Sequence, residues 1–480
     1  MLFNSLGFLI FFPLVTLLYF LLPHKFRWIH LLIASCIFYM AFIPVYIFIL
    51  FFTIIIDYIA GIMIENSVGE NRKLFLTLSI VANVGVLAFF KYYNFFITNV
   101  NTLLHSLHMT PGNIPLLSII LPIGLSFHTF QAMSYTIEVY RGNQKAERHF
   151  GIYSLYVMFY PQLVAGPIER PQNLLHQFKE EHKFDANNLL DGLRLMLWGF
   201  FKKIVIADRI SQYTNTVFNH PYEYHYLNLI IAVFFFSIQI YCDFSGYSDI
   251  AIGAAKTMGF DLMINFNRPY FSKNIQEFWR KWHISLSTWF RDYLYISLGG
   301  NRKGIRRLYF NVAVVFLLSG FWHGANWTYL VWGGLHTIFI FAYMLIEKYY
   351  DIKRLSQKKV LVFISTLFTF CLVSLAWIFF RANTLGDAAI MCKHIFGLYH
   401  SNPFQLVLKN VAGAISFTKT AMLISIAMIA LLFVSEKILP PDLKILNKKY
   451  AADILFCSIT LSLIILLGVF NNNSFIYFQF

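Results

Sequence analysis

Two histidines, His323 and His336, occur in a part of the chain that is otherwise apolar. Both fall within residues 308–346, a run of 39 residues without a formally charged side chain. A titratable imidazole at membrane depth is costly, so it is by default a functional-site hypothesis. The competing interpretation is a core histidine that is hydrogen-bonded to a neighbouring backbone carbonyl. The glycines on both sides of His323, with Trp322 and Asn326 beside it, favour chemistry.

Imidazole is the side chain best suited to take a proton from a hydroxyl group near pH 7. Trp322, Asn326 or backbone N–H groups near the glycines could orient the ring or hold an oxyanion. No serine or cysteine of the chain stands in an activated setting such as Gly-x-Ser-x-Gly. The residues therefore favour direct group transfer over a covalent intermediate on this chain.

The composition places these histidines in a membrane protein. The chain has 480 residues, of which 58% are hydrophobic and 13% charged, and its mean hydropathy is +0.60. A soluble protein carries roughly 25% charged residues. We therefore expect an all-α polytopic membrane protein with roughly 10–13 transmembrane or re-entrant helices, since each span needs about 20 apolar residues. The clearest expected spans are residues 3–22, 28–50, 74–98, 228–256, 358–380, 420–435 and 452–470.

The basic residues predict an orientation. The first apolar run has no basic region before it and no small-residue cleavage site after it, which is typical of a retained helix rather than a signal peptide. Lys25 and Arg27 follow it, so the positive-inside rule places the N-terminus outside. Residues 268–307 carry nine Lys or Arg against two acids, which predicts a cytoplasmic loop near anionic membrane lipid. The same charges could serve a phosphate-bearing donor, whereas nucleic acid is not expected without a soluble basic domain.

The histidine run is too long for one span and long enough for two with a tight turn. Basic or mixed residues flank both ends, so both ends are expected in the cytoplasm. His323 lies 16 residues past Arg307, about 24 Å along a helix, which puts it in the outer half of the bilayer. The two imidazoles could meet because Gly324, Gly333 and Gly334 let the chain turn.

Residues 276–295 form the second segment of interest. At helical spacing, the aromatic and aliphatic residues fall on one face and the charged residues on the other, which predicts an amphipathic helix in the membrane interface. Such a helix can be a structural collar, but its density of Trp, His, Ser and Arg exceeds what a collar requires. The candidate site residues here are Trp279, Arg280, Trp282, His283 and Ser285.

Two carboxylates, Asp243 and Asp249, lie within an otherwise apolar helix. Each should be paired, hydrogen-bonded or protonated, or should face a wet cavity. Packing between helices explains Ser245 and Gly246 well, but it explains two acids poorly. Asp243, Ser245 and Asp249 are therefore candidates for a substrate site or tunnel.

Residues 121–131 and 159–171 contain Pro and Gly inside apolar sequence. Broken helices at membrane depth are tolerated only where they are buried in protein or line a cavity. These segments predict a central tunnel, with interfacial amphipathic helices around it.

No internal repeat, low-complexity stretch or soluble domain is evident. We expect one integral-membrane domain over residues 1–480, with a catalytic core at about 120–346. The five cysteines are scattered without CxxC or His/Cys ligand spacing, so neither a disulfide framework nor a metal site is expected.

The chain resembles the membrane-bound O-acyltransferase family. Within that family it is most similar to the bacterial polysaccharide branch, which includes proteins of alginate and peptidoglycan O-acetylation. The resemblance spans nearly the whole chain, and several of its motifs are long and rich in aromatic residues. Two positions depart from the pattern: Ser297, where proline is expected, and Cys242, where phenylalanine is expected. The matching segments are residues 159–167, 243–249, 265–301, 319–327, 335–336 and 475–480.

The resemblance implies that His323 is the catalytic histidine and His336 a second site residue. It also implies an acyl group moving from a cytoplasmic donor, acetyl-CoA or an acylated carrier, through a channel to a hydroxyl, with no permanently bound cofactor. The expected location is the bacterial cytoplasmic (inner) membrane, and a separate periplasmic or extracellular acetyltransferase would complete the transfer.

Two alternatives remain beside acetyl export for envelope polysaccharide. The chain could move another acyl unit, as the teichoic acid D-alanylation branch does from a carrier protein. It could also be a transporter whose histidines gate protons. A transporter of that kind is expected to show two matching halves with interrupted helices at equivalent positions, and the sequence shows none.

Overall fold

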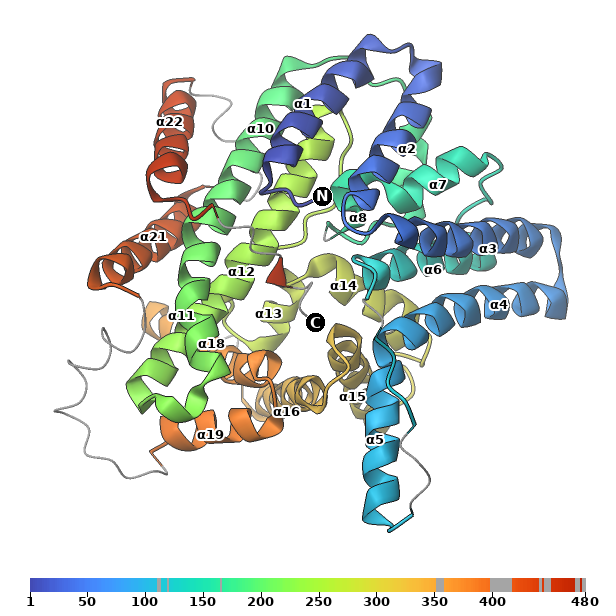
Figure 1. Ribbon diagram of the computed structural model, residues 1–480. Coiled ribbons are helices and arrows are strands. Elements are labelled where there is room, and N and C mark those ends of the chain that lie inside the picture. Colours follow the sequence, from blue (N-terminus) through green and yellow to red (C-terminus); the bar gives the residue numbers. More distant parts are fainter. Residues whose placement is uncertain are drawn as a thin grey trace. The chain divides into compact units, whose positions relative to one another are not determined.

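The computed structural model describes residues 1–109, 114–118, 121–164, 166–350, 358–397, 417–439, 443, 450–470 and 475–476. These residues are helical and contain no strand, which confirms the expected all-α class. The contacts divide them into two compact units, residues 1–193 with 251–263 and residues 194–250 with 264–480. Figure 1 shows the elements of both units.

The first unit contains the N-terminal helices. Its short elements are η1 (Pro44–Tyr46), the π-helical η2 (Ala88–Tyr92) and η3 (His176–Phe178). The α-helices are α1 (Leu6–Leu21), α2 (His24–Met40), α3 (Ile47–Asn66), α4 (Gly69–Leu87), α5 (Tyr93–Ser106), α6 (Leu125–Arg141), α7 (Phe150–Met158), α8 (Tyr160–Leu163) and α9 (Pro171–Leu174). Helix α10 (Ala186–Phe200) leads into the second unit, and α12 (Tyr226–Thr257) has residues in both.

The second unit holds the histidine run and the two aspartates. Its short elements are the π-helical η4 (Phe201–Ala207) and η7 (Phe290–Tyr295), with η5 (Pro221–Glu223) and η6 (Pro269–Phe271). Its α-helices are α11 (Asp208–Asn219), α13 (Ile275–Lys281), α14 (Ile284–Trp289), α15 (Ile305–His323), α16 (Trp327–Tyr349), α18 (Lys359–Arg381), α19 (Leu385–Ile395), α21 (Lys419–Ile438) and α22 (Tyr450–Leu467).

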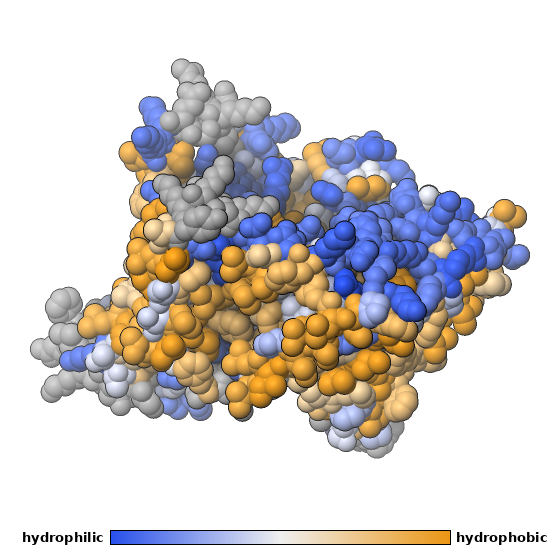
Figure 2. All heavy atoms as spheres, turned by 90° about the horizontal axis from the view of Figure 1, so that it is seen from above, coloured by the Kyte–Doolittle hydropathy of each residue, from blue (hydrophilic) through white to orange (hydrophobic). Residues whose placement is uncertain are grey.

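In the described residues, seven helices are long and apolar enough to cross a membrane, and two shorter apolar helices accompany them. Broad areas of hydrophobic side chains lie on the face drawn in Figure 2. The chain is therefore a multi-pass membrane protein. The expected 10–13 helices included re-entrant ones, and in the described residues shorter helices such as α6 (Leu125–Arg141) and α7 (Phe150–Met158) accompany the candidate spans.

The expected span 28–50 was wrong. Helix α2 ends at Met40, and α3 begins at Ile47 after the 3₁₀ turn that Pro44 opens. Proline at the first position of a helix pre-sets its backbone, and the residue before proline disfavours the helical region. Apolar side chains continue through this turn, so hydropathy alone could not reveal it.

The two segments with helix breakers are broken and buried, as expected. Gly124, with a φ of +76°, precedes α6, and a Cβ there would lie 2.8 Å from the carbonyl oxygen of Leu163. Glu169 is fully buried, and its Oε1 accepts a 2.5 Å hydrogen bond from the backbone N–H of Met263. These irregular stretches are therefore buried in protein inside the first unit, which is one of the two settings in which broken helices at membrane depth are tolerated.

Glycines let α10 and α12 approach closely, and the two helices run side by side (Figure 1). In the second unit, a Cβ on Gly199 would lie 2.6 Å from the carbonyl oxygen of Gly246, and one on Gly246 would lie 2.7 Å from that of Gly199. Only residues without a side chain permit this separation. The contact brings the backbone of η4 against α12.

The predicted hairpin is present, with α15 and α16 packed against each other. A Cβ on Gly320 would meet the carbonyl oxygen of Tyr329 at 2.3 Å, and one on Gly333 would meet that of Phe316 at 2.3 Å. Gly324 is extended and ends α15. A Cβ on Gly334 would meet nothing within 4 Å, so Gly334 takes no part in this approach.

Residues 276–295 do not form one continuous helix, which corrects the sequence-based prediction. The helix ends after Lys281, His283 takes a left-handed backbone with a φ of 44°, and a second helix begins at Ile284. The hydrophobic members of the segment are nevertheless buried, as their shared face predicted: Phe278, Trp282, Leu286, Trp289 and Tyr293. A collar in the interface would leave more of them exposed.

Candidate functional site

His323 is the last residue of α15 and is 4% exposed. Its ring lies 5.3 Å from the ring of Trp332 and 5.2 Å from that of Phe380, both approached edge-on. Trp322 lies 4.9 Å away on the preceding residue. The sequence places the imidazole here because the hairpin glycines bring α16 close to the end of α15.

His336 lies on α16 and is fully buried. Its Nδ1 accepts a 3.3 Å hydrogen bond from the indole N–H of Trp279, on α13. An indole nitrogen only donates, so Nδ1 is unprotonated and the neutral ring carries its proton on Nε2. That Nε2 has no hydrogen-bond partner among the described residues. His336 therefore presents an N–H donor.

The two histidines share one neighbour, the fully buried indole of Trp332. Its ring lies 5.3 Å from that of His323 and 4.8 Å from that of His336. Trp377 stacks on Trp332 at 5.8 Å. We call His323 and His336, together with the surrounding rings of Trp279, Trp322, Trp332, Trp377 and Phe380, the histidine–indole cluster. It combines titratable nitrogen atoms with aromatic walls that exclude water.

His283 belongs to a separate polar group. Its Nδ1 lies 3.0 Å from the Oδ1 of Asn265, and the hydroxyl of Ser285 donates to the same oxygen at 3.0 Å. The amide nitrogen of Asn265 donates to Ser248, on α12. Burial lowers the pKa of His283 from its usual 6.5 to about 3, so this ring is neutral. These bonds hold the break between α13 and α14 against α12, which points to a structural role.

Asp243 and Asp249 are both paired, as expected for acids in an apolar helix. Their partners are adjacent lysines of η4: Lys203 lies 2.6 Å from Asp243, and Lys202 lies 2.5 Å from Asp249. Lys202 also donates to the hydroxyl of Ser245 at 3.0 Å. The close contact of Gly199 with Gly246 allows the two lysine side chains to reach these carboxylates.

A third acid, Asp208, lies 2.9 Å from Lys203. Burial raises the pKa of Asp208 to about 7, which allows this carboxyl to hold a proton beside the other acid. With that proton, the two lysines are balanced by Asp243 and Asp249. We call these five side chains the lysine–aspartate network.

The network also fixes a distant piece of the chain. The Oδ2 of Asp243 accepts a 2.7 Å hydrogen bond from the backbone N–H of Ile476. Phe475 is buried beside it and packs on Phe244 and Tyr247, at ring separations of 5.4 and 4.8 Å. The other residues of the matching segment 475–480 lie outside the described part of the chain.

The remaining predicted residues separate into buried and peripheral ones. Trp282 is buried and packs against Trp377 at 5.1 Å, whereas Arg280 is exposed. Asn326 caps α16: its side chain accepts from the N–H of Thr328 and donates to the carbonyl of Asn383. Neither of these two bonds goes to an imidazole.

Sequence reasoning missed Lys202 and Lys203. Two adjacent lysines in the apolar run 195–207 were a usable signal, because ionisable residues there need partners. It also missed Asn265, Asp208 and Glu436, which carry no recognisable spacing. Within the described residues, no group of three or more His, Cys, Asp or Glu side chains could hold a metal ion.

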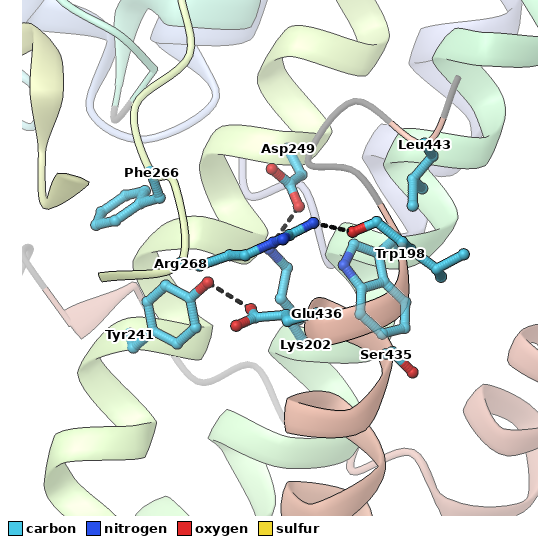
Figure 3. Close-up of a pocket in the computed structure, with 10 residues that line it drawn as sticks. Trp198, Lys202, Tyr241, Asp249, Phe266, Arg268, Ser435, Glu436 and Leu443 are labelled. Atoms are coloured by element: carbon cyan, nitrogen blue, oxygen red, sulfur yellow. Dashed lines mark hydrogen bonds and ion pairs between the residues drawn. The ribbon is translucent and has the colours of Figure 1, made fainter. Parts of the chain in front are cut away.

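Asp249 and Lys202 also line a cavity of ≈ 40 Å³ in the second unit (Figure 3). Arg268 and Glu436 enter it from the segment after α12 and from α21. This cavity, the α21 pocket, is distinct in its side chains from the histidine–indole cluster.

Comparison with known proteins adds independent information. The family model of the membrane-bound O-acyltransferases matches residues 148–382, which include both histidines. The probable alginate O-acetylase of Pseudomonas aeruginosa is 38% identical over 419 residues, covering 86% of this chain and 78% of the relative. The peptidoglycan O-acetyltransferase of Helicobacter pylori is 37% identical over 395 residues, covering 77% and 73%. The teichoic acid D-alanyltransferase of Bacillus subtilis is 30% identical over 244 residues, covering 47% and 60%.

Proposed function

The chain belongs to the membrane-bound O-acyltransferase family, and from that premise we propose that it passes acetyl groups from a cytoplasmic donor across the membrane for O-acetylation of a cell-envelope polysaccharide. Relatives that match most of the chain are named for O-acetylation of alginate and of peptidoglycan, which supports this substrate class. Membership of an acyltransferase family favours acyl transfer over the alternative that the chain is a transporter.

The observation that carries the proposal is the placement of His323 within aromatic walls. A hydroxyl is a weak nucleophile until a base takes its proton, and a positioned base contributes about 10²–10⁴-fold. In the proposed step, the acceptor oxygen attacks the thioester carbonyl of the donor while His323 takes the hydroxyl proton. The carbon–sulfur bond then breaks, and the proton passes to the leaving thiolate.

His336 supports the same step as a hydrogen-bond donor. The hydrogen bond from Trp279 to Nδ1 keeps the proton of the neutral ring on Nε2. A donor aimed at the carbonyl oxygen would stabilise the negative charge that develops there. In this proposal Trp279 is a positioning residue, since it acts through His336.

The donor is proposed to be a thioester, either acetyl-CoA or an acylated carrier protein, arriving from the cytoplasm. The basic residues of 268–307 favour that side for a phosphate-bearing donor. We propose the inner membrane as the location, with the N-terminus outside, and a separate extracytoplasmic acetyltransferase as the partner. The tunnel that would join the two sides belongs to this proposal.

A second candidate is transfer of D-alanyl groups, because a relative named for that activity matches nearly half of the chain. The two candidates use the same base and differ in the acyl group. They are separated by which ester appears on the envelope polymers.

The test is to measure ester-linked acetate and D-alanine on envelope polysaccharides of a deletion strain. The strain is complemented with wild type, His323→Gln, or His182→Gln at equal membrane levels. His182 is a half-buried control histidine whose ring bonds the carbonyl of Gln177. We expect wild type and His182→Gln to restore acetate and His323→Gln to fail. Restored D-alanine without acetate would favour the second candidate, and full acetylation by His323→Gln would overturn the role of His323.

A further inference from the structure

The α21 pocket carries unsatisfied charge of both signs. Glu436 is 8% exposed and lines the cavity, and its Oε1 accepts a 2.5 Å hydrogen bond from the hydroxyl of Tyr241. No hydrogen bond from the described residues reaches its other oxygen, Oε2. This oxygen is available to a donor in the cavity, and a charge-assisted hydrogen bond there would stabilise the carboxylate.

Arg268 lines the same cavity and carries the opposite charge. One of its terminal nitrogens, Nη2, donates to the carbonyl oxygen of Leu439. Its other N–H groups have no hydrogen-bond partner among the described residues. Arg268 and Glu436 form no ion pair with each other within that part of the chain, although both face the pocket in Figure 3. The guanidinium remains open to an anion.

The other two charges of the pocket largely neutralise each other. Lys202 lies 2.5 Å from Asp249, and its ammonium stands 5.9 Å from the ring centre of Tyr241. The ring face therefore already accepts an ammonium group, as aromatic faces do. A lone anion would meet the carboxylate of Glu436, and a lone cation would meet Arg268. A ligand with both charges matches the pocket.

Glu436 and Arg268 are buried to different extents, and this difference determines which charged group of a ligand would meet each of them. Glu436 is nearly buried, whereas Arg268 is half-buried and nearer the surface. A cavity of ≈ 40 Å³ holds about three water molecules at 10–15 Å³ each, so it admits a small terminal group. A terminal ammonium fits inside, and a phosphate next to it then reaches Arg268.

The surface around the pocket favours a lipid over a soluble ligand. Val434 and Ile438 lie one turn apart on α21 and are 55% and 69% exposed, and Leu439 continues this apolar surface into the pocket wall. Helix α21 is one of the candidate membrane spans. Acyl chains attached to a head group in the pocket would lie along this face.

We propose that the α21 pocket binds the head group of a phospholipid bearing a primary ammonium, with the ammonium donating to Glu436 and the phosphate accepting from Arg268. Phosphatidylethanolamine has this chemistry. The site is separate from the histidine–indole cluster, and the proposal stands whether or not the proposed acyl transfer is correct.

The test uses the purified full chain and measures lipid retention by native mass spectrometry. The probes are phosphatidylethanolamine, phosphatidylglycerol and phosphatidylcholine with identical acyl chains. We expect wild type to bind phosphatidylethanolamine about tenfold more tightly than phosphatidylglycerol, the effect of one charge-assisted hydrogen bond. Phosphatidylcholine, whose ammonium cannot donate, should not share this preference. Equal binding of all three would overturn the proposal without any variant.

Variants then locate the site. Glu436→Gln keeps an acceptor for Tyr241 and should reduce the preference to about one, while Arg268→Gln should weaken all three lipids alike. Lys437→Gln, an exposed neighbour on α21, is the matched control and should behave as wild type. A retained preference in Glu436→Gln would place the lipid elsewhere. Competition by free phosphoethanolamine as strong as by the lipid would show a soluble ligand instead.

Discussion

The histidine–indole cluster and the lysine–aspartate network are both buried in the second unit, but they satisfy their polar groups differently. In the network, each lysine lies within 3.0 Å of a carboxylate. In the cluster, aromatic rings surround the imidazoles, and the Nε2 of His336 has no partner among the described residues. The first arrangement uses its charges to hold backbone segments together. The second keeps a polar atom available.

This difference gives a criterion for reading buried titratable residues in a membrane protein. Buried charges that are matched by neighbours depend on one another, because removing one member of a pair leaves an uncompensated charge. Imidazoles held by ring contacts lose less when they are replaced, so their replacement should affect chemistry more than folding. The variants below test that separation, from the largest expected effect to the smallest.

The largest effect is expected on catalysis. His323→Gln should lower acyl transfer about 10²–10⁴-fold, because it removes the proposed base. Its unfolding free energy should change by less than about 1.5 kcal/mol, since the side-chain volume is nearly kept. Transfer rates and thermal unfolding in detergent measure the two effects. His182→Gln, which alters a half-buried histidine outside the histidine–indole cluster, should leave the rate near wild type.

The next effect is expected on stability. Lys203→Met leaves Asp208 and Asp243 without their shared cation, so the chain should lose about 3–5 kcal/mol of unfolding free energy. Exposed Lys303→Met in the basic loop is the control and should change little. Chemical denaturation in detergent micelles measures both. Wild-type stability in Lys203→Met would remove the structural role assigned to the network.

A smaller effect should distinguish two neighbouring glycines of α16. Gly333→Ala introduces a Cβ 2.3 Å from the carbonyl oxygen of Phe316, which should push α15 from α16 and cost about 1–3 kcal/mol. Gly334→Ala meets nothing within 4 Å and should be neutral or slightly stabilising. The thermal midpoints of the two variants make the comparison. Equal midpoints would show that the hairpin does not need this close approach.

The last effect is a pH dependence from His283. Its pKa is about 3 in the folded chain and about 6.5 when unfolded. The unfolded chain therefore binds the extra proton between these values, so stability rises with pH across this window and is lost as pH falls from 6.5. His283→Gln should show a shallower fall in thermal midpoint between pH 6.5 and 4.5. An unchanged slope would mean that other groups cause the acid sensitivity.

The sequence predicted much of this architecture for identifiable reasons. Charge-free length and glycines predicted the α15–α16 hairpin, and the cost of burying a carboxylate predicted partners for Asp243 and Asp249. Helical periodicity correctly grouped the hydrophobic residues of 276–295. These features follow from local sequence and the energetics of a membrane, so no distant contact was needed to infer them.

What the sequence could not predict depends on distant contacts. The break at His283 exists because Asn265 accepts from the N–H of Ser285 and donates to Ser248, a constraint that local periodicity does not contain. Lys202 and Lys203 find their acids on a helix some forty residues further on. Glu436 reaches Tyr241 from 195 residues away in the chain.

The most direct test of the central claim measures acyl transfer and unfolding on the same purified samples of His323→Gln and Lys203→Met. The account predicts that the two variants differ clearly. His323→Gln keeps the wild-type thermal midpoint and loses acyl transfer, whereas the thermal midpoint of Lys203→Met is lowered. Transfer by the fraction of Lys203→Met that remains folded should stay near wild type. A stable Lys203→Met without activity, together with an active His323→Gln, would contradict the account and move the chemistry to the lysine–aspartate network.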